Sequence, residues 1–450
     1  MTSLRVAVVG SGPAGMYAIQ HLLEQSLFDV DIDLFERLPT PWGLVRAGVA
    51  PDHPEKKLIA DRLFRFFLKR DNVRFFGNVE IGSDISHDEL TASYDAVVYA
   101  VGASDDKPLA IPGERLPGSC SAREFVAWYN GHPDYRHLQF DLSGSRAVIV
   151  GTGNVALDVA RMLTLPAPEL ARTDIAEHAL EALQASHVNE VIVLGRRGCQ
   201  QAAFHNPELE ELLHLDGVEV QIEADDLLPP EQTDADWDTR RKLATLIRLQ
   251  ARRVAAPVKR IVFKFHRSPI AVSGDTHVTG VQVQTRVGSG SPRSGLPRYG
   301  SPGSGSPGTI DCGLLLRAIG YRGRALPGLP FDLQTGVISN VAGRVMDGSV
   351  PRTGVYVTGW IRRGPRGVIG SNKQCAAETV GCLLADAQAG KLSHRSDDAV
   401  AQALTATQRQ VVSFGGWQRI DRTERLAGSA RGRPRIKQTD IGELLTSAGR

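Results

Sequence analysis

The chain has 450 residues, of which 42% are hydrophobic and 23% charged, and its formal net charge at pH 7 is +2. This length suggests about three ordinary domain units. The composition excludes bulk disorder, and the small net charge excludes a general affinity for nucleic acid. No apolar run approaches the ~20 residues that span a bilayer and no secretory leader precedes the first apolar run, so a cytoplasmic protein is expected.

The chain opens with a pattern typical of a dinucleotide-binding βαβ unit. The apolar run Val6 to Val9 leads into Gly10-Ser-Gly12-Pro-Ala14-Gly15, and a helix is predicted from about Pro13 to Glu24. Such glycines permit a tight turn and a close approach to a pyrophosphate, which then rests on the helix N-terminus. The following strand ends at Glu36, whose carboxylate can accept hydrogen bonds from ribose hydroxyls and would repel a 2′-phosphate.

Two later β-rich runs mark the predicted domain boundaries. The first spans Asp95 to Ala103 and the second Leu314 to Tyr321, and each ends in a turn of small residues. These runs resemble those that leave and re-enter a nucleotide domain in flavoproteins with two dinucleotide sites, so we expect a second domain, residues 106–324, to be inserted between the two parts of the first, residues 1–105 and 325–450. The first domain is then discontinuous in sequence.

The inserted domain contains a second copy of this glycine-rich pattern, which we call the dinucleotide-binding fingerprint. The run Ala147 to Val150 leads into Gly151-Thr152-Gly153-Asn154-Val155-Ala156, and an additional helical stretch is expected within Pro166 to His187. The next strand ends at the adjacent Arg196 and Arg197. Guanidinium groups match the charge and geometry of a 2′-phosphate, so this turn is predicted to bind NADPH. A solvated basic loop is the alternative interpretation.

A basic stretch follows from Thr239 to Gly274, with ten Lys and Arg residues and no Asp or Glu. A helix is predicted from about Thr239 to Val254. Arg241, Arg248 and Arg252 share one face of it, which could steer an acidic partner. An ordinary solvated helix face is the alternative, and nucleic-acid binding is disfavoured because no aromatic stacking pattern accompanies the charge.

Two other segments carry no motif. Residues 288–308 are rich in Gly, Ser and Pro, and they are expected to form a flexible hairpin tip at the surface. The stretch from Lys391 onward is expected to contain a helix near Asp397 to Arg409. We expect it only to complete the first domain.

Three segments resemble one family closely. They are Leu38 to Pro54, Gly151 to Arg161, and Gly359 to Gly370. With them, nearly the whole chain resembles the adrenodoxin-reductase-like ferredoxin-NADP reductases, most closely those of actinobacteria. The resemblance implies an α/β fold of two Rossmann-like dinucleotide-binding domains, with the NADPH domain inserted into the FAD domain.

The resemblance also implies the cofactors and their sites. FAD would contact the following residues: Gly10, Gly12, Ala14, Gly15, Glu36, Leu44, Val79, Trp360, Gly367, Val368 and Ile369. NADPH or NADP+ would contact a second set: Lys107, Thr152, Gly153, Asn154, Val155, Arg196, Arg197, Glu208 and Gly367. Composition and spacing support the two glycine-rich turns, Glu36 and the arginine pair independently, whereas Trp360, Val79 and Gly367 rest on the resemblance alone.

The implied activity is a flavoprotein reductase. A hydride passes from NADPH to FAD, and single electrons then pass to a small acidic ferredoxin; no metal is required. His53 and Glu211 are the candidate catalytic groups for proton transfer near the flavin, and the resemblance implies that both approach the nicotinamide. A turn-stabilising histidine and an exposed helix carboxylate remain the alternative.

Other activities on the same fold stay open at this point. A flavin disulfide reductase is disfavoured because Cys120, Cys199, Cys312, Cys375 and Cys382 lack close spacing. A monooxygenase would need coupled hydroxylation of a substrate. An electron-input subunit without turnover of its own would need a separate iron-sulfur protein.

Overall fold

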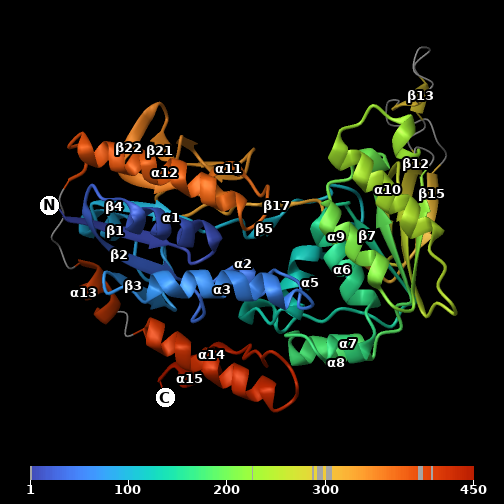
Figure 1. The fold of residues 1–450 in the computed structure, drawn as a ribbon, viewed down its shortest axis with the longest axis horizontal. Coiled ribbons are helices and arrows are strands. Elements are labelled where there is room, and N and C mark those ends of the chain that lie inside the picture. Colours follow the sequence, from blue (N-terminus) through green and yellow to red (C-terminus); the bar gives the residue numbers. More distant parts are fainter. Residues whose placement is uncertain are drawn as a thin grey trace. The chain divides into compact units, whose positions relative to one another are not determined.

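The computed structural model describes residues 3–224, 227–285, 288–290, 297–299, 307–393, 399–406 and 409–449. The chain forms two compact units, residues 1–106 with 320–450, and residues 107–319. The second unit is inserted into the first, so the first is discontinuous in sequence (Figure 1). Among the described residues, no helix is long and apolar enough to cross a membrane.

The first unit is built on a seven-stranded sheet with the order β20-β21-β22-β4-β1-β2-β3. Its strands are β1 (Ser3–Val9), β2 (Asp29–Glu36), β3 (Val73–Gly77), β4 (Ala96–Tyr99), β20 (Asn340–Val341), β21 (Arg344–Asp347) and β22 (Val350–Val357). Strands β22, β4, β1, β2 and β3 are parallel, and β20 and β21 add antiparallel pairs at one edge. Two small antiparallel pairs complete its strands: β5 (Asp105–Asp106) with β17 (Tyr321–Arg322), and β18 (Phe331–Asp332) with β19 (Val337–Ile338).

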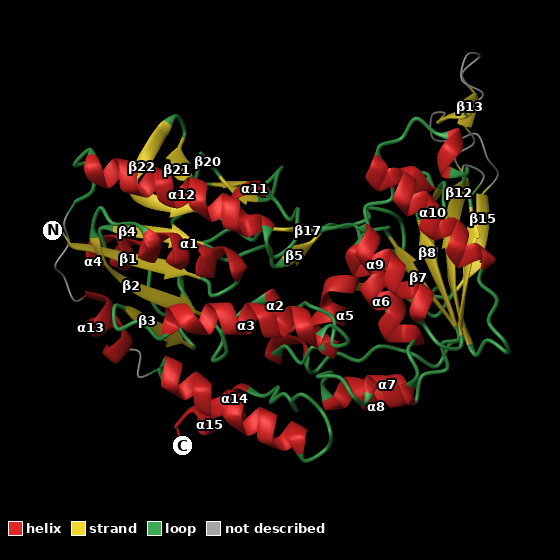
Figure 2. Ribbon diagram, viewed as in Figure 1, coloured by secondary structure: helices red, strands yellow, loops and turns green. Residues whose placement is uncertain are grey.

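Helices cover this sheet and extend beyond it (Figure 2). They are α1 (Pro13–Glu24), α2 (Leu44–Ala47), α3 (Pro54–Leu68), α4 (His87–Ser93), α11 (Trp360–Arg363), α12 (Ser371–Gln388), α13 (Ala399–Ala406), α14 (Phe414–Ser429) and α15 (Ile441–Gly449). One core packs α1, α3, α12 and α14 against alternate residues of β1 and β2, including Val6, Val8 and Ile32. The residues between them, including Ala7 and Val9, face a second core on the other side of the sheet.

The inserted unit contains a six-stranded parallel sheet with the order β6-β16-β7-β8-β10-β9. The strands of this unit are β6 (Ser119–Ser121), β7 (Arg146–Val150), β8 (Glu190–Leu194), β9 (Val218–Glu223), β10 (Lys259–Lys264), β11 (Arg267–Ser273), β12 (Gly280–Thr285), β13 (Gly288–Gly290), β14 (Pro297–Tyr299), β15 (Pro307–Asp311) and β16 (Leu314–Arg317). An antiparallel sheet of β11, β12 and β15 packs against one face of the parallel sheet. Strands β13 and β14 pair separately.

The other face of the parallel sheet packs against helices. They are α5 (Ala122–Tyr129), α6 (Asn154–Thr164), α7 (Ala167–Leu170), α8 (Glu177–Gln184), α9 (Asn206–Glu211) and α10 (Trp237–Ala251). Short 3₁₀ turns occur at Pro133–Tyr135, Cys199–Gln201, Leu212–His214 and Pro230–Gln232. Parallel strands joined through helices give the unit its Rossmann-like character.

Several element predictions can be compared with these bounds. The helix predicted from Pro13 to Glu24 is confirmed, and α7 and α8 supply the helical stretch expected between residues 166 and 187. The helix expected near Asp397 to Arg409 corresponds to α13, although residues 394–398 and 407–408 lie outside the described part. Most of the Gly/Ser/Pro segment 288–308 also lies outside it, apart from β13, β14 and the start of β15.

The predicted basic helix has different limits in the structure. Helix α10 begins at Trp237, because the Asp236 side chain caps it by accepting a hydrogen bond from the Thr239 N–H at 2.7 Å. It ends at Ala251, so Arg252 is its C-cap residue and does not continue the helical face. The expectation that Arg252 lies within this helix was therefore wrong.

Candidate functional site

The turn between β1 and α1 admits only glycine at two positions. Gly10 has φ +103°, and a Cβ there would lie 2.7 Å from the carbonyl oxygen of Ala100. A Cβ at Gly15 would lie 2.0 Å from the carbonyl oxygen of Gly10. The fingerprint glycines therefore make this turn as tight as the sequence predicted.

The N-terminus of α1 is open to a ligand. Gly12 is the N-cap residue, and no atom lies within 4 Å of the position where its Cβ would stand. The first N–H groups of a helix have no partner within the helix and carry the positive end of its dipole. A pyrophosphate can therefore approach the backbone of this turn closely.

The acidic end of the turn is already organised by the protein. One carboxylate oxygen of Glu36 accepts hydrogen bonds from the Ser11 hydroxyl at 2.6 Å and the Ser11 N–H at 3.1 Å. The other accepts a bond from the N–H of Leu38 at 3.1 Å. Glu36 therefore fixes the shape of the turn in addition to presenting an acid at the end of β2.

Two loops close around this turn. The Ser11 hydroxyl also accepts a bond from the Trp42 N–H at 3.2 Å, and a Cβ on Gly43 would lie 3.2 Å from the Gly12 Cα. From the C-terminal part, a Cβ on Gly359 would lie 2.4 Å from the Ala14 Cβ. Glycines 43 and 359 thus allow both loops to contact the first turn.

Most of the remaining predicted FAD residues lie on these loops or next to Glu36. Leu44 begins α2 and is exposed, whereas Val79 is buried and donates its N–H to the Glu36 carbonyl at 2.9 Å. Trp360 directly follows Gly359, and its Nε1 donates to the Arg366 carbonyl at 3.1 Å. That bond shapes the loop carrying the exposed Gly367 and Val368 and the half-buried Ile369.

The second fingerprint repeats this geometry in the inserted unit. Gly151 has φ +126°, and a Cβ there would lie 2.3 Å from the carbonyl oxygen of Ala318. Gly153 is the N-cap residue of α6, and no atom lies within 4 Å of the position where a Cβ would stand. Ala156 stands where the first turn has Gly15, and it is fully buried.

The basic end of the second turn is open. Arg196 and Arg197 follow β8 and are both exposed, and Arg197 makes one long side-chain hydrogen bond, 3.4 Å to the carbonyl of Gln201. The backbone beneath them is held, because the Gly195 N–H donates to the Lys264 carbonyl at 2.9 Å. The two guanidinium groups are thus presented on a fixed backbone.

The loop that precedes the predicted NADPH contact Glu208 is bonded to the second turn. The Asn154 amide oxygen accepts a bond from the His205 N–H at 2.8 Å, and its Nδ2 lies 3.0 Å from the His205 Nδ1. The Ala203 N–H donates to the Thr152 carbonyl at 2.8 Å. This loop leads into α9, which carries the half-buried Glu208.

The two candidate proton-transfer residues have defined surroundings in their own units. His53 is buried at the N-cap of α3, with its Nδ1 3.4 Å from the Lys56 Nζ. Glu211, at the end of α9, forms an ion pair at 3.0 Å with the buried Arg161. Lys107 is exposed at the start of the inserted unit.

The basic face predicted on α10 is partly neutralised. Arg241 makes a bidentate ion pair with Glu210 at 2.7 and 2.8 Å, and Arg252 donates to the backbone carbonyls of Val218 and Leu215. Arg248 is exposed. The stretch from Thr239 to Gly274 contains no acid, but in the folded protein an acid from outside it, Glu210, lies against Arg241.

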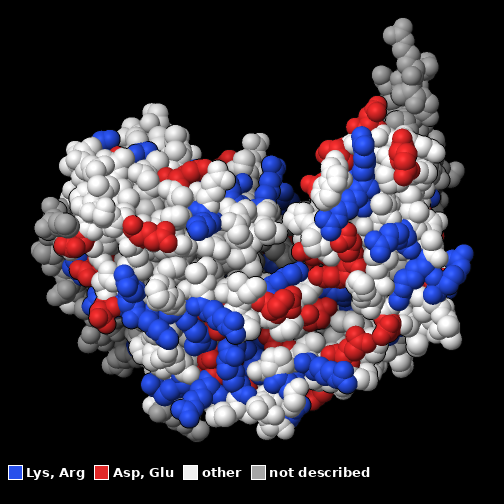
Figure 3. Space-filling model, viewed as in Figure 1, with Lys and Arg blue, Asp and Glu red and all other residues white. Residues whose placement is uncertain are grey.

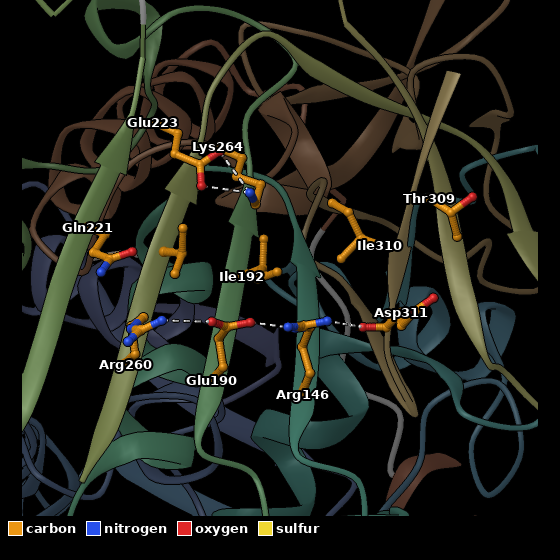
Figure 4. Close-up of a pocket in the computed structure, with 11 residues that line it drawn as sticks. Arg146, Glu190, Ile192, Gln221, Glu223, Arg260, Lys264, Thr309, Ile310 and Asp311 are labelled. Carbon is orange, nitrogen blue, oxygen red and sulfur yellow. Dashed lines mark hydrogen bonds and ion pairs between the residues drawn. The ribbon is translucent and has the colours of Figure 1, made fainter. Parts of the chain in front are cut away.

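A polar pocket of about 320 Å³ lies on the inserted unit's parallel sheet, on the face opposite the helices (Figure 4). Glu190 pairs there with Arg146 and with Arg260, and Lys264 pairs with Glu223 at 2.7 Å. The lining runs from the first residues of β7 and β8 to the last residues of β9 and β10, and it includes no residue of the second turn and neither Arg196 nor Arg197. We therefore do not assign the nucleotide to this pocket.

Sequence reasoning missed a buried ion-pair network that supports the first turn. Arg46, in the segment that follows Trp42, makes a bidentate ion pair with the fully buried Glu424 of α14 at 2.5 and 2.9 Å. Arg435 pairs with the same carboxylate at 3.0 Å. Burial alone raises the pKa of Glu424, but the two guanidinium groups bring it below its usual value. Arg46 and Glu424 are 378 residues apart in the sequence, so no local pattern could reveal their pair.

Fold and site together define a protein with two dinucleotide-binding turns, one in each unit. Residues 4–224 match the family model of pyridine nucleotide-disulphide oxidoreductases. All five cysteines are free, and all lie within the described residues.

Comparison with known proteins identifies the family. The chain is 45% identical over 456 residues to the NADPH-ferredoxin reductase FprA of Mycobacterium tuberculosis, covering 98% of each chain. It is 42% identical to the mitochondrial NADPH:adrenodoxin oxidoreductase of Arabidopsis thaliana, covering 99% of this chain and 95% of that protein. The solved structure of M. tuberculosis FprA in complex with NADPH superposes with a TM-score of 0.92 over the full length of both chains, at 42% identity. The chain belongs to the NADPH-ferredoxin reductase family.

Proposed function

We propose that this protein is an FAD-dependent NADPH-ferredoxin reductase. The observation that carries the proposal is the contrast between its two fingerprint turns: one ends at the carboxylate of Glu36 and the other at the exposed Arg196 and Arg197. A carboxylate suits a ribose with free hydroxyls, whereas paired guanidinium groups suit a 2′-phosphate. Membership of the family supports the same pairing of nucleotides.

FAD fits the first turn. Its pyrophosphate would rest on the backbone of Gly10, Gly12 and Gly15 at the start of α1, and Glu36 would bind the ribose. Leu44, Val79, Trp360 and the loop 367–369 would hold the remainder of the cofactor. The close packing of Gly359 on Ala14 supports this assignment, because it brings the Trp360 segment to the same turn.

NADPH fits the second turn. Its pyrophosphate would lie along Thr152 to Val155 at the start of α6, and its 2′-phosphate would meet Arg196 and Arg197. Lys107, Glu208 and Gly367 are the further proposed contacts. The open space at Gly153, like that at Gly12, admits a pyrophosphate, and the exposed guanidinium groups support a nucleotide that enters and leaves.

The chain's own residues bind and orient the two nucleotides. When bound, FAD accepts two electrons from NADPH and releases them one at a time to an iron-sulfur protein. We propose that His53 and Glu211 hold or move protons at the reacting ends of the nucleotides. The Arg161 pair fixes the Glu211 carboxylate, and the His53 ring is buried with its Nδ1 3.4 Å from the Lys56 Nζ. A purely structural role for both residues is the alternative.

The electron acceptor is proposed to be an acidic ferredoxin. The positive charge of the stretch from Thr239 to Gly274 supports electrostatic steering of such a partner. Arg241, Arg248 and Arg252 are the candidate residues within it. The pairing of Arg241 with Glu210 makes Arg248 the strongest of the three candidates. The cytoplasmic location expected from the sequence stays a prediction.

The test is stopped-flow spectroscopy of the purified yellow protein with NADPH and with NADH, followed by steady-state reduction of an acidic ferredoxin. We expect NADPH to bleach the flavin absorbance far faster than NADH, with coupled ferredoxin reduction. A protein that hydroxylates a substrate in tight coupling with NADPH oxidation, or that shows no turnover alone, would contradict the proposal.

His53→Ala and Glu211→Ala test the proton-transfer roles. Positioned acid-base groups typically contribute about 10²-fold or more to the steps that they assist. We expect each variant to slow flavin reduction or reoxidation and to change the pH profile of the step that it slows. Glu210→Ala is the matched control on α9. If both variants keep the wild-type rates and pH profile, the roles are structural.

A further inference from the structure

Helix α3 carries an apolar stripe that faces solvent. Ile59 is 68% exposed and Phe66 62% exposed, and Leu63 between them is also exposed. Their spacing of four and three residues places them on one face of the helix. A solvent-facing helical stripe is ordinarily polar, and a contiguous apolar one is typical of a binding surface.

Cationic side chains lie beside this stripe on α3 and on the neighbouring helix α14. Arg62 lies within it, Lys69 and Arg70 follow the end of α3, and Arg422 lies on α14; all four are exposed. Glu55 is the one exposed acid of α3 and α14, both of which are fully described, and the exposed Asp71 directly follows Arg70. Figure 3 shows Lys and Arg side chains gathered over the region where Figure 1 draws these two helices.

The other acids of the two helices are directed inward. Asp61 and Asp421 are buried and share Arg65, at 2.9 and 2.7 Å, and Arg425, at 3.3 and 2.9 Å. These ion pairs hold α14 against α3, and the two arginines neutralise the negative charge of the two carboxylates. The outward surface therefore keeps its positive charge, with Leu426, 63% exposed, directly after Arg425.

We infer that this α3–α14 surface docks the acidic iron-sulfur protein that accepts the electrons, an inference that rests on the proposed function. An apolar centre with a cationic rim complements an acidic protein with an apolar contact area, and the rim charges speed its arrival. The surface also begins close to the proposed chemistry. Ile59 lies six residues after His53, about 9 Å along the helix axis.

Charge also distinguishes this occupant from others. A second copy of the chain would place the same arginines against one another, which like-charge repulsion disfavours. An anionic lipid surface shares the complementary charge but has no electron to accept. The position of the stripe next to the proposed site of electron transfer favours the redox protein.

Two double variants test the inference. Arg62→Glu/Arg422→Glu reverses the rim charge, and Ile59→Ser/Phe66→Ser removes the apolar centre. Arg115→Glu/Arg172→Glu is the charge control, because both residues are exposed in the inserted unit and the change in net charge is the same. Val341→Ser controls for the loss of an exposed apolar side chain.

The measurements use FAD-loaded protein and two small acidic ferredoxins, one with [2Fe–2S] and one with [4Fe–4S] clusters. Titration calorimetry with the oxidised ferredoxin gives its dissociation constant without turnover, and steady-state reduction gives KM and kcat. NADPH-dependent ferricyanide reduction reports chemistry that needs no protein docking. Sedimentation velocity and flotation with anionic vesicles report the other occupants.

The inference predicts that both α3–α14 variants weaken ferredoxin binding about tenfold or more, while ferricyanide reduction and both control variants match the wild type. Dissociation constants equal to those of the controls would overturn it, as would variants that change only the oligomeric state or only vesicle binding. If the wild-type protein oxidises NADPH but reduces neither ferredoxin, the proposed function itself fails.

Discussion

The two fingerprint turns share one backbone design but differ in how completely the protein organises them. Around the first turn, the carboxylate of Glu36 is bonded to Ser11 and Leu38, and segments from distant parts of the chain pack on Gly12 and Ala14. Around the second turn, Arg196 and Arg197 extend into solvent. The first turn is preorganised, and the second is open on its basic side.

This difference matches what each nucleotide has to do in the proposed reaction. A preorganised site binds tightly because its groups lose little freedom when the ligand arrives, which suits a cofactor that stays. A site whose charges are still solvated binds more weakly and releases faster, which suits a nucleotide that exchanges in every cycle. Each prediction below alters one side of this comparison.

The largest effect is expected at the third glycine of the first turn. Gly15→Ala would place a methyl group 2.0 Å from the Gly10 carbonyl oxygen, so the turn must open. We expect the variant to be purified with little or no FAD, measured as the ratio of flavin to protein absorbance. The matched control is Ala156→Gly in the second turn, which should keep its FAD and lose only about 1 kcal/mol of stability. Full FAD content in Gly15→Ala would show that the first turn is not tight.

The second prediction concerns the buried carboxylates behind the first turn. For Asp421 and Glu424, burial alone would raise the carboxyl pKa, but neighbouring arginines hold the folded values below the ordinary 3.8 and 4.5. Stability from these groups is fully present above the ordinary values and is lost as the pH falls through the lower folded ones. FAD should therefore be released in acid below about pH 4.5, seen as a rise in flavin fluorescence.

Glu424→Gln isolates this contribution. It leaves Arg46 without its anion, which typically costs about 3 kcal/mol for a buried pair, whereas Arg435 keeps its second pair, with Asp421 at 2.8 Å. We expect FAD release at milder denaturant concentrations at neutral pH and a flatter acid dependence. Glu190→Gln, which breaks a pair in the inserted unit, should leave FAD release unchanged. If Glu424→Gln and the wild type release FAD along the same curves, then the ion pairs of α14 do not stabilise the first turn.

The sequence was most informative where a local pattern has a single structural solution. The α/β fold and the helix at Pro13–Glu24 follow from strand, turn and helix signals within about 30 residues of each other. Arg252 shows the limit, because its side chain returns to the backbone carbonyls of Val218 and Leu215 instead of extending the basic face. The ion pair between Arg46 and Glu424 could not be predicted from the sequence either, because residues that pair over a long separation produce no periodic pattern in it.

The smallest effect is expected at the arginine pair, because exposed charges contribute less than buried ones. Arg196→Ala/Arg197→Ala should raise the KM for NADPH about tenfold to a hundredfold through the lost charged hydrogen bonds, with NADH kinetics and FAD content unchanged. Arg172→Ala, an exposed arginine of the same unit, is the control. Equal losses for NADPH and NADH would mean that the pair supports the turn generally. A selective loss would mean that the two turns differ in the charge with which they recognise a ribose. The second turn would then owe its preference for NADPH over NADH to the side chains of Arg196 and Arg197, which are exposed to solvent until the nucleotide binds.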